Sequence, residues 1–233
     1  MNRRTFVRTL PALGVLAGTA LGFAEDLQPI ALLEPERDGG KSVLAALHQR
    51  RTIRDISDRP LPPQALSNLL WAAFGVNRRS GPFGQVGRTA ASASNSQEID
   101  LYVAMPQGVF LYEAAAHRLA PVVAGDLRGK AGGRGRGGGA AKAPLSLIFV
   151  ADIAKYGQAR LQEPGLRDAD IQKAYYHVAT GLIAGNVYLF AASQGLAAWF
   201  HNCNKAALTA ELKLRGEQRV LFAQTVGYPA RTA

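Results

Sequence analysis

Residues 168–192 read DADIQKAYYHVATGLIAGNVYLFAA, and apolar side chains recur on most sides of the helix that this run predicts. Asp168 can cap the start, and Gly195 follows where a glycine commonly ends a helix. A helix that is apolar all round is buried, so we expect the central core helix of the domain. Small residues such as Gly181 and Gly185 permit close approach of another helix, which predicts a place in a subunit interface.

The composition indicates one substantial folded domain. The chain has 233 residues, of which 48% are hydrophobic and 19% charged, enough for a sizeable core and unlike a disordered chain. The net charge of +10 suits attraction to nucleic acid, anionic lipid or small anions. Cys203 is the single cysteine, which excludes an intrachain disulfide and a cysteine zinc site within one chain. The four histidines lack metal-ligand spacing, so we expect no metal.

Residues 1–24 have the features of a twin-arginine signal peptide. Arg3 and Arg4 precede a modestly apolar run, and small residues follow where signal peptidase cleaves. The run is too short and too rich in glycine and alanine to make a good membrane span. We therefore expect a protein that is exported in folded form, to the periplasm or another space outside the cytoplasm.

The remaining chain divides into an arm and one domain. Residues 25–40 hold prolines and mixed charges and predict an extended arm, which leaves residues 41–233 as the domain. Ser42 can cap a first helix that runs to about residue 50. The apolar residues Val43, Leu44 and Leu47 share one face of that helix.

Further elements follow from apolar periodicity and turn residues. Pro63 suits the first position of a helix that ends at Gly75. The other predicted elements are strands over 99–105, 109–112, 145–150, 196–200 and 219–226, a helix over 206–214, and loops over 77–87 and 124–142.

A basic segment follows the first helix. Arg50, Arg51, Thr52 and Arg54 place three guanidinium groups and one hydroxyl within five residues, a set that would satisfy a phosphate monoester. Cations near a helix C-terminus also complement the helix dipole and often do nothing more, and the residues alone favour that interpretation. The small, polar residues 88–97 are, by themselves, most simply a solvated loop.

Seven short stretches of the chain form a recognisable series. In order, they are residues 50–54, 69–77, 92–97, 108–112 with 117–119, 143–144, 185–189 with 195–196, and 226–229. Together they resemble the flavin-dependent nitroreductase family, and more narrowly its branch of dehydrogenases that form thiazoles and oxazoles in peptides. Thr52 stands where the family usually has Ser, Ala91 where it usually has Pro, and Gly185 where the branch often has Gln.

The resemblance implies an α+β fold, with a mixed sheet flanked by helices, and an obligate homodimer with two FMN molecules at the interface. It implies a ping-pong oxidoreductase that passes hydride or electrons to or from a small organic substrate. The residues that it assigns to the cofactor are Arg50, Arg51, Thr52, Arg54, Ser92, Asn95, Gln97, His201, Asn202 and Arg231.

These residues have different implied roles. The segment 50–54 would bind the phosphate, ribityl chain and pyrimidine edge, and Arg231 would add to the phosphate site. Ser92, Asn95 and Gln97 would reach the flavin across the dimer. Residues 200–202 would lie along the ring, where a backbone N–H can donate to the reactive nitrogen.

No catalytic side chain is assigned, because the flavin would carry the chemistry. Tyr175, Tyr176 and His177 are candidates to donate a proton near it, although core packing is the favoured interpretation for all three. The electron donor can be a quinol, a protein or NAD(P)H, and an exported enzyme would not meet the cytoplasmic NAD(P)H pool.

Two other functions compete with this interpretation. A non-catalytic flavin-binding protein would carry FMN without turnover. Nucleic-acid binding would use the Gly/Arg-rich residues 129–139, including Arg134 and Arg136. Single-strand binders pair such cations with aromatic side chains, which this segment lacks, so we expect no nucleic-acid partner.

Overall fold

The computed structural model describes residues 27–81, 84–132 and 142–230. The predicted leader, Arg231 and most of the Gly/Arg-rich segment lie outside the described residues. The described helices are α1 Val43–Gln49, α2 Pro63–Phe74, α3 Arg128–Ala131, α5 Ala169–Gln194 and α6 Lys205–Glu211, with 3-10 turns η2 Ala93–Asn95, η3 Ile153–Gln158 and η4 Pro164–Arg167. The strands are β1 Ile30–Ala31, β2 Val76–Arg78, β3 Gly87–Arg88, β4 Ile99–Met105, β5 Gly108–Glu113, β6 Arg118–Ala124, β7 Leu145–Asp152, β8 Ala197–His201 and β9 Gln218–Gly227.

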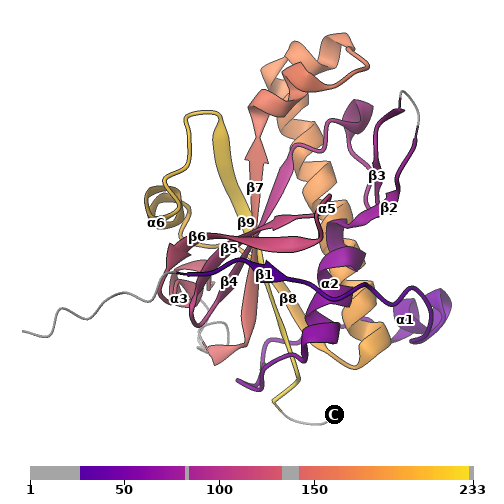
Figure 1. The fold of residues 1–233 in the computed structure, drawn as a ribbon, viewed down its shortest axis with the longest axis vertical. Helices are drawn as coiled ribbons and strands as arrows, with labels where there is room; N and C mark the ends of the chain where they lie inside the picture. The colour runs from indigo at the N-terminus through magenta and orange to yellow at the C-terminus, as the bar shows by residue number, and fades with distance from the viewer. Residues whose placement is uncertain (1–26, 82–83, 133–141, 231–233) are drawn as a thin grey trace, which may run out of the picture.

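Seven strands form one sheet in the order β1-β6-β5-β4-β7-β9-β8, and β2 pairs with β3 in a separate ribbon. Helices α2 and α5 cover one face of the sheet, and α3 and α6 cover the other (Figure 1). This α+β architecture confirms the predicted fold class. Each strand pairing is antiparallel, so the described sheet differs from the implied mixed sheet.

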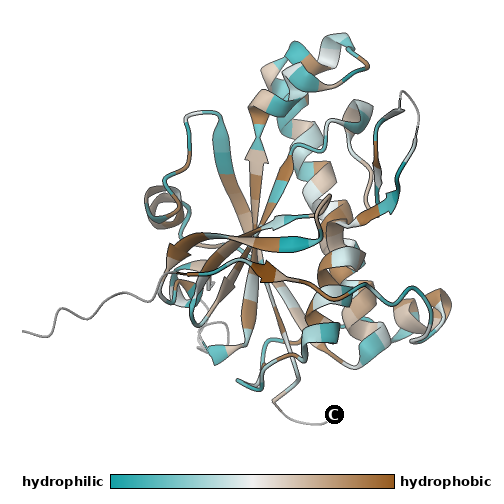
Figure 2. Ribbon diagram, in the orientation of Figure 1, coloured by the Kyte–Doolittle hydropathy of each residue, from teal (hydrophilic) through white to brown (hydrophobic). Residues whose placement is uncertain are grey.

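The interior strand β7 is buried on both faces, as its continuous apolar sequence predicts. Side chains alternate along a strand. Leu147 and Phe149 therefore pack with α2 and α5, whereas Ile148 and Val150 pack with α3 and α6. Brown, hydrophobic segments accordingly concentrate on the strands in the middle of the sheet and on the helices beside them (Figure 2).

The long helix α5 has the predicted limits. The Asp168 side chain accepts hydrogen bonds from Asp170 N and Ile171 N, and Gly195 ends the helix at φ +68°, which favours glycine. The expectation that all sides are buried is wrong for a single chain. Val178 is 62% exposed and Leu182 46%, because none of the described elements covers this outer side.

Three further predictions need correction. In α1, Ala46 is the buried residue, whereas Leu44 on the predicted apolar face is 78% exposed. The predicted loop over 77–87 begins and ends in the short β2–β3 ribbon, and the predicted loop over 124–142 contains the short helix α3. In addition, strand β6 was not predicted, because Pro121 and a half-exposed pattern conceal it.

Candidate cofactor site

The basic segment leaves α1 as an exposed turn that is anchored to the sheet. Ile53 N donates to Ala198 O of β8 at 3.1 Å. One Nη atom of Arg51 donates to His48 O and to Arg50 O, at 2.8 and 2.9 Å. Arg51 therefore satisfies carbonyl groups at the C-terminal end of α1, as expected for a cation at this position. These contacts use one Nη atom and do not exclude ligand binding by the other N–H groups of the guanidinium.

Tyr188 of α5 joins this segment to β8. Its hydroxyl accepts from Phe200 N at 2.9 Å and lies 3.2 Å from Thr52 Oγ1. The Arg50 guanidinium lies 5.5 Å from the Tyr188 ring centroid, and the Arg54 guanidinium 5.9 Å from that of Trp199. Aromatic faces attract cations at such distances. Aromatic rings thus hold Arg50 and Arg54, and neither forms an ion pair with a carboxylate among the described residues.

The end of β8 carries an aromatic cluster. Phe200 lies between Phe149 and Phe222, with ring centroids 5.8 and 4.9 Å away, and Phe222 lies 6.0 Å from exposed His177. Burial, with Lys173 and Lys205 nearby, lowers the pKa of His177 below its ordinary value. The structure therefore places one of the candidate proton donors beside the segment expected to lie along the flavin.

The His201 side chain points into the core network rather than to a ligand surface. Its Nδ1 is 2.8 Å from Asn202 O, and its Nε2 is 2.8 Å from Thr225 Oγ1. Burial lowers the pKa of His201, in keeping with a neutral ring. Any contact of this segment with a flavin would involve its backbone or exposed Asn202.

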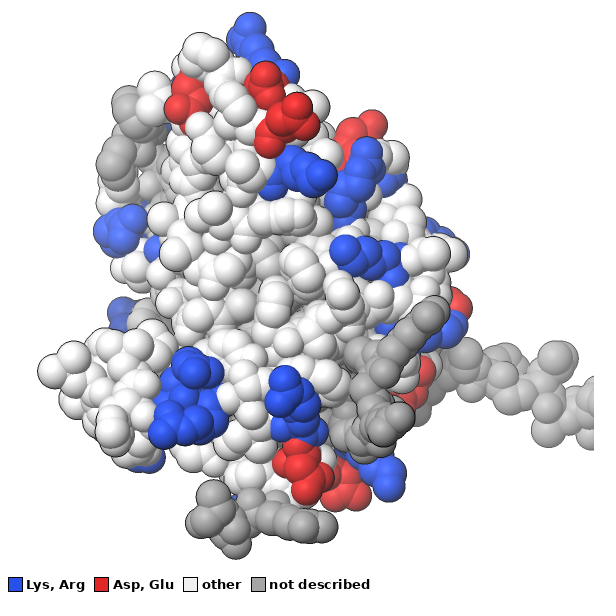
Figure 3. All heavy atoms as spheres, turned by 180° about the vertical axis from the view of Figure 1, so that it is seen from behind, with Lys and Arg blue, Asp and Glu red and all other residues white. Residues whose placement is uncertain are grey.

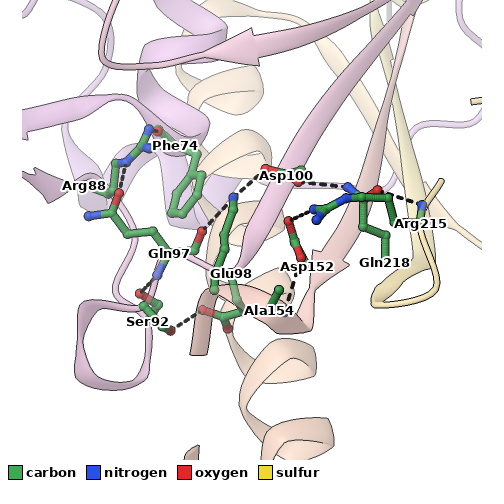
Figure 4. A network of polar contacts seen from close by, with 12 residues as sticks. Phe74, Arg88, Ser92, Gln97, Glu98, Asp100, Asp152, Ala154, Arg215 and Gln218 are labelled. Atoms are coloured by element: carbon green, nitrogen blue, oxygen red, sulfur yellow. Dashed lines mark hydrogen bonds and ion pairs between the residues drawn. The ribbon is translucent and has the colours of Figure 1, made fainter. Parts of the chain in front are cut away.

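A second cluster of predicted residues lies in the loop before β4. Gln97 N donates to Ser92 Oγ at 2.9 Å, and the Gln97 amide donates to Val86 O and Asn95 Oδ1. Arg88 Nε donates to Gln97 Oε1 at 2.7 Å, so the Gln97 side chain is fully engaged (Figure 4). Ser94, Asn95 and Gln97 all have φ near +50°, a costly conformation that commonly marks a functional loop.

The two clusters do not meet within one chain. In Figure 1, α1 lies beside the C-terminal end of α5, whereas β2 and β3 lie beside its upper half. The first cluster contains Arg50, Arg51, Thr52 and Arg54 and adjoins His201 and Asn202; the second contains Ser92, Asn95 and Gln97. Arg231 lies outside the described residues.

The first cluster fits a phosphate monoester by its donor set. None of the ion pairs among the described residues involves Arg50, Arg51 or Arg54, and all three side chains are exposed. Guanidinium forks and a hydroxyl are the groups that bind phosphate oxygens. Tyr188 and Arg88 support these two clusters through hydrogen bonds, but the sequence did not reveal this role. A tyrosine in a helix and an arginine in a loop carry no distinctive sequence signal.

Neither a metal cluster nor a membrane span is evident in the described part of the chain. No group of three or more His, Cys, Asp or Glu side chains is placed to hold an ion. Across the described ranges, no helix has the length and apolarity needed to cross a bilayer.

An antiparallel sheet between helices, with a basic segment against its longest helix, defines a nitroreductase-like α+β protein. The nitroreductase family model matches residues 47–228. The chain belongs to the nitroreductase family. It is 34% identical to a solved Ralstonia eutropha protein described as a nitroreductase, with a TM-score of 0.73, covering 97% of this chain and 100% of that one.

Two more distant proteins share the family or the fold. A Methanocaldococcus jannaschii protein described as a nitroreductase is 28% identical over 158 residues, which is 64% of this chain and 73% of that protein. The Bacillus megaterium protein NfrA2 is 18% identical with a TM-score of 0.58, covering 82% of this chain and 68% of that one. The second likeness concerns the fold alone.

Proposed function

We propose that the protein is an FMN-dependent oxidoreductase that transfers hydride or electrons, in a ping-pong reaction, between a donor and a small organic substrate. The observation that carries the proposal is the exposed basic segment, whose three guanidinium groups lack a carboxylate among the described ion pairs. Like charges held close together repel, and a phosphate dianion would relieve that repulsion.

FMN, when bound, would supply the redox chemistry, and the chain would bind and orient it. Arg50, Arg54 and the Thr52 hydroxyl would hold the phosphate and the adjoining chain. Phe200 N already donates to Tyr188, so the proposal assigns the backbone donor for the ring to residues 201–202.

We also propose that the working unit is a homodimer. The two predicted clusters lie at different ends of α5, so one site can contain both only if a second chain supplies one of them. The exposed apolar residues of α1 and α5, among them Leu44, Val178 and Leu182, give that second chain a surface to cover. Figure 3 shows a broad band without charged side chains on the rear face.

Removal of Arg54 tests the cofactor assignment. A hydrogen bond to a charged group contributes about 1.5–3 kcal/mol, so Arg54→Ala should weaken FMN binding about tenfold or more in a fluorescence titration. Arg59→Ala is the matched control, because Arg59 stacks on Tyr228, 4.1 Å away, outside the segment.

The possible outcomes distinguish an error in the proposed function from an error in the assignment of the binding residues. A wild-type protein that binds no FMN would overturn the proposed function. Unchanged affinity in both Arg50→Ala and Arg54→Ala would overturn only the residue assignment. Turnover distinguishes an enzyme from a protein that merely carries the flavin.

A further inference from the structure

A second basic region, distinct from the segment after α1, surrounds a cavity of about 450 Å³ beside the loop before β4. Three cations line it, Arg88, Lys155 and Arg160. The uncharged polar side chains that line it are Gln85, Asn95, Ser96, Gln97 and Gln158. None of the described residues that line the cavity is acidic.

Arg88 is held rigidly at this cavity. Its Nε donates to Gln97 Oε1 at 2.7 Å, its Nη1 donates to Phe74 O at 3.0 Å, and the guanidinium lies 4.9 Å from the Phe74 ring centroid. Burial lowers the pKa of Arg88, but an arginine remains charged at neutral pH. Its charge is not paired with a carboxylate in any ion pair of the described ranges.

Glu98 and Asp100, the acids that follow this loop, offset the charge of the cavity only in part. Asp100 pairs with Lys155 at 2.5 Å, and the buried Glu98 accepts from Ser96 Oγ at 2.7 Å. Lys155 Nζ also donates to Gln97 O at 3.3 Å, which leaves one of its three N–H groups. The positive charges of Arg88 and Lys155 are therefore only partly compensated.

We propose that this cavity binds the carboxylate of an organic substrate, so that the enzyme prefers anionic over neutral substrates. The inference rests on the proposed function, because Asn95 and Gln97 form both the cavity wall and the loop expected to reach the flavin of the other subunit. A planar carboxylate matches a guanidinium fork. Two separate cationic sites then hold the two anions, cofactor and substrate.

The test compares two nitroaromatic compounds that differ in charge. The holoprotein is reduced chemically, and reoxidation is followed by stopped flow with 4-nitrobenzoate or with neutral 4-nitrobenzamide. We expect half-saturation at an about tenfold lower concentration for the carboxylate, the effect of one charged hydrogen bond. Calorimetric titration of the oxidised protein with benzoate should show the same site without turnover.

Arg160→Glu should remove this preference, and Arg160 is exposed, so the substitution leaves the core intact. Arg219→Glu is the matched control, since Arg219 is an exposed arginine outside the cavity. Lys155→Gln gives a second, milder variant. Loss of the preference for the carboxylate in Arg160→Glu but not in Arg219→Glu supports the proposal.

Equal half-saturation by both compounds in the wild type, with no benzoate binding, overturns the inference while the proposed function stands. A preference that survives in both cavity variants overturns it as well. A protein without bound flavin, or reduced flavin that neither compound reoxidises, counts against the proposed function instead.

Discussion

The Tyr188 hydroxyl contacts two segments that are far apart in the sequence, through Phe200 N and Thr52 Oγ1. Tyr188→Phe would leave a half-buried backbone N–H without its acceptor, at a cost of about 1–3 kcal/mol. We expect a lower free energy of unfolding in urea and weaker FMN binding. Tyr228→Phe is the control, because the ring beneath Arg59 is retained; equal losses in the two variants would contradict the special role of Tyr188.

His117 gives the protein a predictable response to acid. Its Nδ1 is 2.9 Å from Tyr112 OH, its Nε2 is 2.7 Å from Ser67 Oγ, and Ser67 in turn donates to Leu33 O of the arm. Because Ser67 donates to a carbonyl, Nε2 donates to Ser67. Burial lowers the pKa of His117 from the ordinary 6.5 and so favours the neutral ring, in which Nδ1 accepts from Tyr112.

A lowered pKa means that the unfolded chain binds a proton at a pH where the folded chain does not. The free energy of unfolding should therefore fall as the pH drops below about 6.5 and on through the folded pKa, by up to about 1.4 kcal/mol per pH unit for one group. His117→Asn, which tolerates the left-handed φ of +46°, should flatten this slope in urea titrations at several pH values. An unchanged slope would show that His177 and His201, shifted in the same direction, are responsible.

Among the elements, α5 and β7 were predictable because their signals are long and apolar. Asp168 and Gly195 add cap chemistry that is readable from the sequence alone. Strand β6 escaped prediction because it lies between β5 and a two-residue strand, so only part of it needs to be apolar. The α1 face was misassigned, because exposed apolar residues, which are proposed here to face a partner chain, look identical in sequence to residues that face the core.

The candidate site likewise has one part that is recognisable in the sequence and one part that is not. The arginine segment is recognisable because its charges are close together in the sequence. The engagement of Gln97 by Arg88, and of Phe200 N by Tyr188, depends on chain segments that only folding brings together. Sequence therefore proposes the residues of the site, but it does not tell which of their polar groups other chain segments already engage.

Gly181 provides a selective test of the α5 interface. A Cβ built at Gly181 meets nothing within 4 Å in the described chain, so a larger side chain is tolerated there by a single subunit. Gly181→Leu should even stabilise the isolated helix by about 1 kcal/mol, through its higher helix propensity. In a dimer packed on this face the same side chain should overpack, at a cost of about 1–3 kcal/mol.

Sedimentation at micromolar concentration measures the two effects. We expect a wild-type dimer and a Gly181→Leu protein that is folded but dissociates more readily, with Gly181→Ala intermediate. A wild-type monomer would contradict the homodimer, and a stable Gly181→Leu dimer would place the interface elsewhere.

The whole chain is proposed to fold before it leaves the cytoplasm, through the twin-arginine leader in residues 1–24. The residues proposed to bind FMN begin at Arg50, well after the leader, so holding the protein inside the cell should not change its visible spectrum. Replacement of Arg3 and Arg4 together by Lys should leave a yellow, folded protein in the cytoplasm, measured by cell fractionation. Export of that variant at the wild-type rate would refute the proposed route.

The compartment also constrains the electron donor. A protein that works outside the cytoplasm should accept electrons from a quinol or a protein more readily than from NADPH. Stopped-flow reduction of the mature form by NADPH at a kcat/KM near 10⁶ M⁻¹s⁻¹, within the ordinary range for enzymes, would overturn this expectation.

The arm that pairs with β6 has a further consequence for a chain that begins near residue 25. Ile30 and Ala31 form the strand at one edge of the sheet, where Leu32 N also donates to His117 O at 3.3 Å. At the other edge, Ile53 N donates to Ala198 O of β8. Uncovered edge strands recruit strands from other molecules and lead to aggregation. Trimming of the chain end past Ala31 would therefore expose the β6 edge and let two molecules pair edge to edge, an association that light scattering would detect.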